Sequence, residues 1–329
     1  MKGSYEVVVQ NARVQFKFVV SRNLTILRGD SATGKTTLID MIGEYDEMGK
    51  SSGVELRCEK PCRVLSGRTW KAILQTIQDS IVFIDEGNEF VRTEEFAHEI
   101  QKTDNYYVIA TRSSLFMLPY SVNEVYGIYN TTSKYSPVKR MYSQFYHIYG
   151  TITPPNLPEF EAVLVEDSHA GFEFFARICS EQEIACYSAK GKSNIYSKLL
   201  GMDEKSILVV ADGAAFGPEI ERLISLQKAK DIVLFLPESF EWIILKSGLV
   251  SDREITRVLE NPSDEIESRE YFSWEQFFTK LLSRKTEGTY LRYSKSKLNP
   301  VYLNERERKM ILNTIPDLLK KNYKEGHDG

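Results

Sequence analysis

Short apolar segments separated by polar turns run through most of the 329-residue chain and predict an α/β protein. Tyr5–Val9 and Val14–Val20 flank a polar turn, which predicts a β-hairpin. A third apolar run, Leu24–Leu27, leads to a glycine, and helical spacing of apolar residues begins near Lys35. Further strands are predicted at Val54–Arg57, Arg63–Leu65, Ile81–Ile84 and Tyr106–Ala110, with helices at Thr69–Gln78 and Thr93–Lys102. This alternation predicts a parallel sheet with helices on both faces.

The second half repeats the alternation after a proline-rich segment. Residues 151–159 read TITPPNLPE, which predicts a stiff linker between one domain at residues 1–150 and another at residues 160–329. Buried parallel strands are predicted at Ala162–Val165, Ile184–Tyr187, Ile207–Val210 and Ile232–Phe235. Helices are predicted at Gly171–Ile178, Asn194–Leu200 and Pro218–Leu226. From Ser273 onward the chain reads as helical pieces rich in Lys and Arg.

The composition narrows the class of protein. The net charge of −4 leaves no global basic field, so nucleic-acid binding would need a local patch. The first residues contain no apolar signal segment, and no stretch approaches the 18 apolar residues of a membrane span. Four cysteines are too few for a disulfide framework. These features favour a cytoplasmic protein with no membrane partner, and ordinary thiols over a zinc site at Cys58 and Cys62.

A phosphate-binding loop (Walker A) follows the third strand. The segment GDSATGKTT fits GxxxxGK[ST], and it joins a strand to a helix as the motif requires. Converging backbone N–H groups and the helix N-terminus would bind phosphate oxygens. Lys35 would reach the β- and γ-phosphates of ATP or GTP, and the Thr36 hydroxyl would bind Mg²⁺. The predicted nucleotide-contacting residues of this loop are Gly29, Asp30, Ser31, Ala32, Thr33, Gly34, Lys35, Thr36 and Thr37.

Two later strand ends supply the remaining groups of a nucleotide site. IVFIDE ends in Asp85, a predicted Mg²⁺ ligand (Walker B), and in Glu86, the predicted base for the attacking water. This Asp-Glu pair favours hydrolysis over transfer, with a P-loop kinase as the alternative. Thr111 is the predicted γ-phosphate sensor and Arg112 its charge partner, or a residue that completes a neighbouring subunit's site in a homo-oligomer. Only about 50 positions separate Lys35 from Asp85, which excludes an ABC ATPase and makes residues 65–68 (LSGR) a turn.

Carboxylates also follow the predicted strands of the second domain. Glu166 and Asp167 end one strand, Asp212 ends another, and Glu238 and Glu241 follow a third. Because parallel strands end at one edge of a sheet, we expect these carboxylates to converge. Converging like charges favour a divalent cation among them, which predicts Mg²⁺ or Mn²⁺ at Glu166, Asp212 and Glu241. Two-metal phosphoryl chemistry uses such sites.

These segments resemble the TOPRIM domain of topoisomerases, primases and nucleases. VLVED ends at the acidic pair, AKGKSNI supplies a glycine turn at Gly191, and VVADG ends at Asp212. The resemblance covers residues 160–249, and it departs from the Asp-x-Asp pattern at Ala214, with Asp167 or Glu219 as substitutes. A P-loop ATPase followed by such a domain is similar in architecture to the overcoming-lysogenisation-defect nucleases, which are associated with defence against phage. The resemblance implies a nuclease with Glu166 and Asp212 as catalytic residues.

Two hypotheses for the whole chain follow from these motifs. In the first, ATP binding or hydrolysis gates metal-dependent cleavage of DNA or RNA. In the second, the chain is an ATP-driven switch whose second domain binds nucleic acid or a partner protein without catalysis, which Ala214 favours. A phospho-receiver domain is a further alternative for the second half. A basic cluster with interspersed tyrosines near the C-terminus predicts either a phosphate-backbone patch or a solvated helix face; it comprises Lys280, Arg284, Lys285, Arg292, Lys295 and Lys297.

Overall fold

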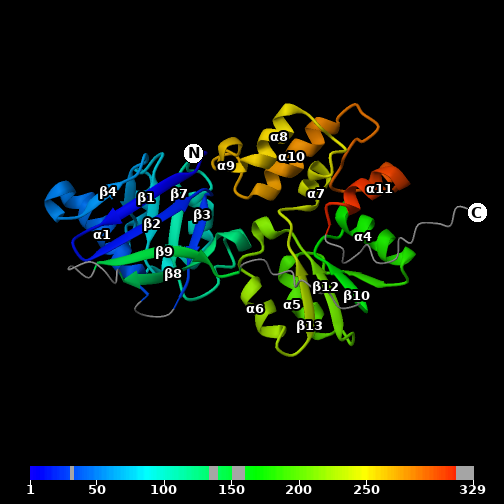
Figure 1. Cartoon of the computed structure of the whole chain (residues 1–329), viewed down its shortest axis with the longest axis horizontal. Coiled ribbons are helices and arrows are strands. Elements are labelled where there is room, and N and C mark those ends of the chain that lie inside the picture. The colour runs from blue at the N-terminus through cyan, green and yellow to red at the C-terminus, as the bar shows by residue number, and fades with distance from the viewer. Residues whose placement is uncertain (30–32, 133–139, 150–159, 316–329) are drawn as a thin grey trace, which may run out of the picture. The chain divides into compact units, whose positions relative to one another are not determined.

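The computed structural model describes residues 1–29, 33–132, 140–149 and 160–315, and the chain forms two compact units (Figure 1). The first comprises Met1–Gly150 with Asn261–Ser273, and the second comprises Thr151–Glu260 with Trp274–Gly329. The predicted linker at residues 151–159 lies outside the described residues, as do Asp30, Ser31 and Ala32 of the predicted phosphate-binding loop.

The described part of the first unit contains a nine-stranded sheet in the order β4-β1-β2-β9-β8-β3-β7-β6-β5. Its strands are β1 (Tyr5–Gln10), β2 (Val14–Val20), β3 (Leu24–Leu27), β4 (Glu55–Arg57), β5 (Cys62–Val64), β6 (Ile81–Ile84), β7 (Tyr106–Ala110), β8 (Val125–Thr132) and β9 (Met141–His147). Its helices are α1 (Lys35–Met48), α2 (Trp70–Leu74), α3 (Glu94–Ile100) and α9 (Pro262–Glu265), with 3₁₀ turns η1 (Gly49–Ser52), η2 (Glu89–Arg92) and η3 (Val122–Glu124).

This sheet is mixed, which corrects the expectation of a parallel one. The five strands β8-β3-β7-β6-β5 are parallel to one another. The pairs β1–β2, β1–β4 and β8–β9 are antiparallel. The predicted hairpin at β1 and β2 is confirmed, whereas β8 and β9 were not predicted. The sequence of β8, VYGIYNTT, is rich in the β-branched and aromatic residues that favour strands, so its strand signal was present but was not used.

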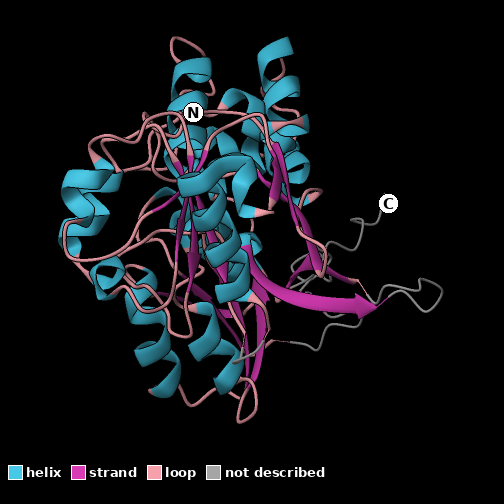
Figure 2. Cartoon of the chain, turned by 90° about the vertical axis from the view of Figure 1, so that its left-hand side faces the viewer, coloured by secondary structure: helices cyan, strands magenta, loops and turns pink. Residues whose placement is uncertain are grey.

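Both faces of the parallel strands are covered by helices, whose ribbons appear with the strands in Figure 2. Alternate residues of β6 divide between two apolar clusters: Ile81 and Phe83 pack with residues of α1, and Val82 and Ile84 pack with residues of α2 and α3. This division explains why the strand is apolar throughout, because neither of its faces meets solvent. The strand ends therefore remain as the accessible edge of this part of the sheet.

A late segment of the chain returns to the first unit, although the predicted boundaries assign it to the second domain. Residues 261–273 bond to the N-terminal region: Gly3 donates its backbone N–H to the Ser263 carbonyl at 2.7 Å. Asn23 Nδ2 donates to the Phe272 carbonyl at 2.7 Å. These contacts join residues about 250 positions apart, so no local sequence pattern predicts them.

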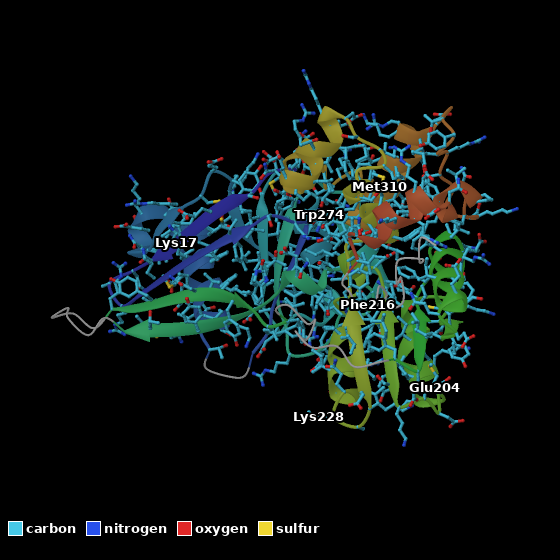
Figure 3. The ribbon with its side chains drawn as sticks, turned by 45° about the vertical axis from the view of Figure 1, so that its right-hand side comes forward. Lys17, Glu204, Phe216, Lys228, Trp274 and Met310 are labelled. Carbon is cyan, nitrogen blue, oxygen red and sulfur yellow. The ribbon has the colours of Figure 1, made fainter. Side chains whose placement is uncertain are left out.

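The described part of the second unit contains a parallel sheet in the order β11-β10-β12-β13. Its strands are β10 (Ala162–Val165), β11 (Ala185–Ser188), β12 (Ser206–Val210) and β13 (Asp231–Phe235). Its helices and turns are α4 (Ala170–Glu181), α5 (Lys192–Leu200), η4 (Gly213–Ala215), α6 (Ile220–Leu226), α7 (Phe240–Lys246), α8 (Arg253–Glu260), α10 (Trp274–Thr286), η5 (Pro300–Leu303) and α11 (Glu305–Leu312). All four predicted strands are confirmed. Figure 3 shows Phe216 near the edge where β12 ends, and Glu204 and Lys228 at the opposite edge.

Candidate functional site

The described part of the predicted phosphate-binding loop has positive φ angles at two of its glycines. Gly29 and Gly34 have φ angles of +142° and +100°, in the region that favours glycine. Gly34 caps α1, and its carbonyl accepts the Leu38 N–H at 2.9 Å. A side chain at Gly34 would also contact the Phe16 ring, since a Cβ there would lie 3.5 Å from it. The loop thus joins the end of β3 to the start of α1, as the motif predicts.

Lys35 turns its ammonium group back over this loop. The side chain is buried, and Nζ donates to the Gly29 carbonyl at 2.6 Å and to Thr33 Oγ1 at 3.3 Å. The neighbouring Thr36 and Thr37 are exposed, and the Thr36 hydroxyl has no hydrogen-bond partner among the described residues. The positive charge therefore lies at the backbone turn where the phosphates are predicted to bind.

The strand order brings the other predicted nucleotide residues to the same edge. β7 lies between β3 and β6, and all three strands are parallel. Neighbouring strands are roughly 5 Å apart, so the ends of β3 and β6 are about 10 Å apart with the end of β7 between them. The loop, Asp85–Glu86 and Thr111–Arg112 thus lie at adjacent strand ends.

Asp85 is arranged to leave one oxygen available. Its Oδ1 accepts the Glu86 N–H at 2.8 Å, and Oδ2 has no partner among the described residues. The Asp85 carbonyl accepts from Asn88, whose Oδ1 accepts the Gly67 N–H at 3.0 Å and fixes the turn at residues 65–68. The hard oxygens of Asp85 and Thr36 suit Mg²⁺, so these residues fit the predicted ion.

Glu86 is paired with Arg112 from the neighbouring strand end. Arg112 Nε donates to Glu86 Oε2 at 3.1 Å and Nη2 donates to Oε1 at 2.7 Å, so both carboxylate oxygens are engaged. The Arg112 guanidinium lowers the pKa of Glu86, and the charge of Lys35 adds to this effect. Thr111 is buried, and its hydroxyl donates to the Ser113 carbonyl at 2.9 Å and accepts the Ser113 N–H at 3.1 Å. Its sensor role stays a prediction.

In the second unit, Glu166 and Asp212 meet at the ends of the neighbouring strands β10 and β12. Glu166 Oε2 accepts the Asp212 N–H at 3.0 Å. A cavity of about 200 Å³ lies at this edge. Its lining is Glu166, Asp167, Ser168, Lys190, Gly191, Asp212, Glu275 and Lys295. The predicted convergence of these two carboxylates is therefore observed.

Both carboxyl groups are shifted toward their neutral forms. Burial raises the pKa of Glu166 to about 7, and the charge of Glu275 adds to this effect. Burial also raises the pKa of Asp212 well above its usual range, reinforced by Glu275, Glu166 and Glu241. Burial is the larger cause in each case, since it penalises the ionised form more than the nearby lysines favour it.

Glu275 and two lysines join this cluster, although sequence reasoning did not assign them to it. Glu275 on α10 pairs with Lys295, which the sequence placed only in the basic cluster. Lys192, the first residue of α5, donates Nζ to the Ala215 carbonyl at 2.7 Å, and burial lowers its pKa. The only sequence signal was the charge of the residues, because tertiary packing brings α10 and α5 to the strand ends.

The carboxylates proposed as further ligands have structural partners. Asp167 accepts the N–H groups of Ser168, His169 and Gly171 at 2.7, 3.1 and 2.8 Å, at the start of α4. Glu241 is buried and accepts from the Tyr293 hydroxyl at 2.8 Å. Glu219 is buried beside Arg222.

The metal site predicted in the second unit stays a prediction. Among the residues that the structure describes, no group of three or more His, Cys, Asp or Glu side chains is placed to hold a metal ion. Cys58 and Cys62 are free thiols, and Cys62 is buried.

Part of the predicted basic cluster is neutralised within the second unit. Arg284 bonds to Glu254 at 2.5 Å, and Lys285 pairs with Asp252 and Glu254. Tyr293, one of the tyrosines interspersed in this cluster, is buried. These ion pairs favour the interpretation of a solvated helix face over that of a phosphate-backbone patch.

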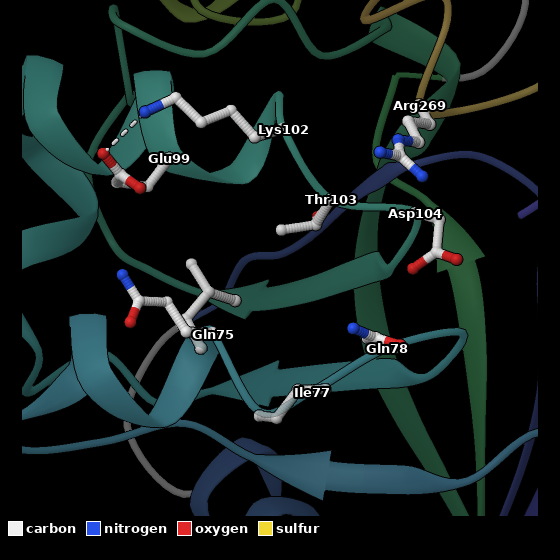
Figure 4. A pocket seen from close by; sticks show the side chains of 9 residues that line it. Gln75, Ile77, Gln78, Glu99, Lys102, Thr103, Asp104 and Arg269 are labelled. Carbon is white, nitrogen blue, oxygen red and sulfur yellow. Dashed lines mark hydrogen bonds and ion pairs between the residues drawn. The ribbon is translucent and has the colours of Figure 1, made fainter.

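A larger cavity, of about 460 Å³, lies where β6 and β7 begin, at the edge opposite the phosphate-binding loop (Figure 4). Its lining is Leu74, Gln75, Ile77, Gln78, Glu99, Lys102, Thr103, Asp104 and Arg269. Lys102 pairs with Glu99 at 2.9 Å, and Asp104 Oδ1 accepts the Asp79 N–H at 2.9 Å. None of the predicted nucleotide residues lines this cavity.

Comparisons with known proteins add no assignment to these sites. No protein-family model matches the sequence, and no curated protein matches it significantly. Across the part of the chain that the structure describes, no helix is both long and apolar enough to cross a bilayer.

Proposed function

We infer that the first unit binds a nucleoside triphosphate with Mg²⁺ and hydrolyses its terminal phosphate. One observation carries the proposal: the order β3-β7-β6 places Lys35, Asp85, Glu86 and Arg112 at adjacent strand ends. The backbone of the loop and Lys35 supply positive charge for the phosphates. A Mg²⁺ ion held by Thr36 and Asp85 would neutralise charge on the phosphate oxygens.

Glu86, which follows Asp85 after β6, is the residue that we propose to orient the attacking water. In the proposed reaction, a water oxygen bonds to the γ-phosphorus, the bond from that phosphorus to the bridging oxygen breaks, and Glu86 accepts the water proton. The alternative, a P-loop kinase, would transfer the phosphate to an acceptor hydroxyl. The two reactions differ in whether phosphate is released free or attached to an acceptor.

A substitution at Lys35 tests the proposal. Lys35→Ala removes the ammonium group at the loop, and we expect ATP and GTP binding to weaken by at least about 100-fold. Lys50→Ala, at an exposed lysine of η1, is the matched control and should bind as the wild type does. Fluorescent-nucleotide titration measures the affinity, and a phosphate-release assay separates hydrolase from kinase. Equal affinity in Lys35→Ala and Lys50→Ala would refute the proposal.

The proposal extends to the second unit as an effector that responds to the nucleotide. Its resemblance to TOPRIM domains supports contact with DNA or RNA, and Ala214, where the TOPRIM pattern has an aspartate, supports binding without cleavage. Metal-dependent cleavage is the second candidate, favoured by the meeting of Glu166 and Asp212. Incubation with DNA or RNA and Mn²⁺, with a Glu166→Ala/Asp212→Ala variant as control, separates the two. Cutting that the variant loses would establish a nuclease, whereas nucleotide-dependent binding alone would support the switch.

A further inference from the structure

The ion pair with Arg112 restrains Glu86, the residue that is proposed to orient water. The guanidinium engages both oxygens of the carboxylate, at 2.7 and 3.1 Å. A two-point contact of this kind fixes the plane of the carboxylate as well as its position. While Arg112 holds it, Glu86 cannot turn toward a water molecule without losing at least one of these bonds.

This pair is placed where it can be broken. The side chains of Arg112 and Glu86 are 59% and 27% exposed, and ion pairs with such solvent access are weak. Arg112 follows β7, the strand next to both β3 and β6, and β7 is roughly 5 Å from the strand that leads into the predicted phosphate-binding loop. A terminal phosphate carries more negative charge than one carboxylate and accepts the same two-point contact from a guanidinium.

We propose that Arg112 is the residue that distinguishes a nucleoside triphosphate from a diphosphate, by exchanging Glu86 for the γ-phosphate. The exchange stabilises the bound triphosphate and releases Glu86 to orient the attacking water. A diphosphate offers no γ-phosphate, so the Arg112–Glu86 pair persists. Arg112 therefore acts within its own chain, where sequence reasoning had left open a role across a subunit interface. This inference rests on the proposed nucleotide site.

The experiment compares affinities for a non-hydrolysable ATP analogue and for ADP. We expect Arg112→Ala to weaken binding of the analogue by about 10- to 100-fold and to change ADP binding by less than about 2-fold. Arg112→Lys keeps the charge and should restore part of the loss. Glu86→Gln weakens the restraint and should tighten binding of the analogue a few-fold, without an effect on ADP. Arg63→Ala removes another partly exposed ion pair of the first unit, with Asp46, and serves as the control.

The outcomes separate this inference from the proposed function. An analogue-to-ADP affinity ratio in Arg112→Ala equal to that of the wild type would overturn the exchange, although the nucleotide site would stand. Absence of binding of either nucleotide to the wild type would overturn the proposed function itself. If Arg112→Ala lost affinity for the analogue and for ADP together, the Arg112–Glu86 pair would be shown to support the fold of the site. That result also would overturn the exchange.

Discussion

The two sheets end in similar residues but surround them differently. After β6 the chain reads Asp85-Glu86-Gly87, and after β12 it reads Ala211-Asp212-Gly213. At the first edge, Asp85 keeps an oxygen without a partner among the described residues. At the second edge, Asp212 shares its surroundings with Glu275 and Lys295.

This difference shows that a carboxylate at a strand end does not by itself make a site. The first edge gathers Lys35, Asp85, Glu86 and Arg112 from nearby strand ends. The second edge supplies its own counter-charges, since Lys295 pairs with Glu275 and the charge of Lys192 acts to lower the pKa of Glu166. We therefore expect substitutions at the first edge to affect ligand binding more than stability, and those at the second edge to do the reverse.

The largest expected contrast is between the two glycines that follow the acids. A Cβ at Gly213 would lie 2.5 Å from the Leu236 carbonyl oxygen and 2.9 Å from that of Pro237, whereas a Cβ at Gly87 meets nothing within 4 Å. We expect Gly213→Ala to cost about 3 kcal/mol of stability in the second unit, because backbone must move. Gly87→Ala should change stability by less than about 1 kcal/mol. Hydrogen exchange of the two sheets measures each unit separately, and equal effects would contradict the contrast.

The residues of the first edge were largely predictable, because local patterns define them. The pattern of a strand, a glycine-rich turn and a helix predicts the loop at Lys35. An apolar run that ends in two acids predicts Asp85 and Glu86. The pairing of Glu86 with Arg112 was not predictable, since it depends on β7 lying between β3 and β6. Strand order is a tertiary property that no local pattern encodes.

The second edge was predictable only in part for a related reason. Glu166 and Asp212 end predicted strands, and the rule for parallel sheets brings them together. Glu275 lies on a helix more than 60 residues beyond Asp212, and neither its neighbours nor its spacing mark it as part of a site. Asp167 shows the converse problem, since its sequence position suggests chemistry and its three backbone hydrogen bonds show a structural role.

A smaller contrast is expected in pH dependence. The pKa of Glu166 is raised from 4.5 to about 7 in the folded protein, so its ionisation opposes folding as the pH rises between these values. We expect Glu166→Gln to stabilise the second unit by roughly 2 kcal/mol at pH 8 and to have little effect at pH 4.5. Glu86 has the opposite shift, so its contribution to stability is lost as the pH falls. Hydrogen exchange in EDTA at the two pH values tests this, and no gain at pH 8 would contradict it.

The smallest contrast concerns the two aspartates, Asp85 and Asp167. Asp167 accepts three backbone N–H groups at the start of α4, and removal of such a cap costs about 1 kcal/mol. We expect Asp167→Ala to destabilise the second unit by that amount and to leave nucleotide hydrolysis unchanged. Asp85→Asn retains the oxygen that accepts the Glu86 N–H, so stability should change by less than about 0.5 kcal/mol while hydrolysis falls at least about 100-fold. Urea unfolding and phosphate release measure the two quantities. If Asp167→Ala abolished hydrolysis and Asp85→Asn preserved it, the assignment of binding to the first edge and structure to the second would be reversed.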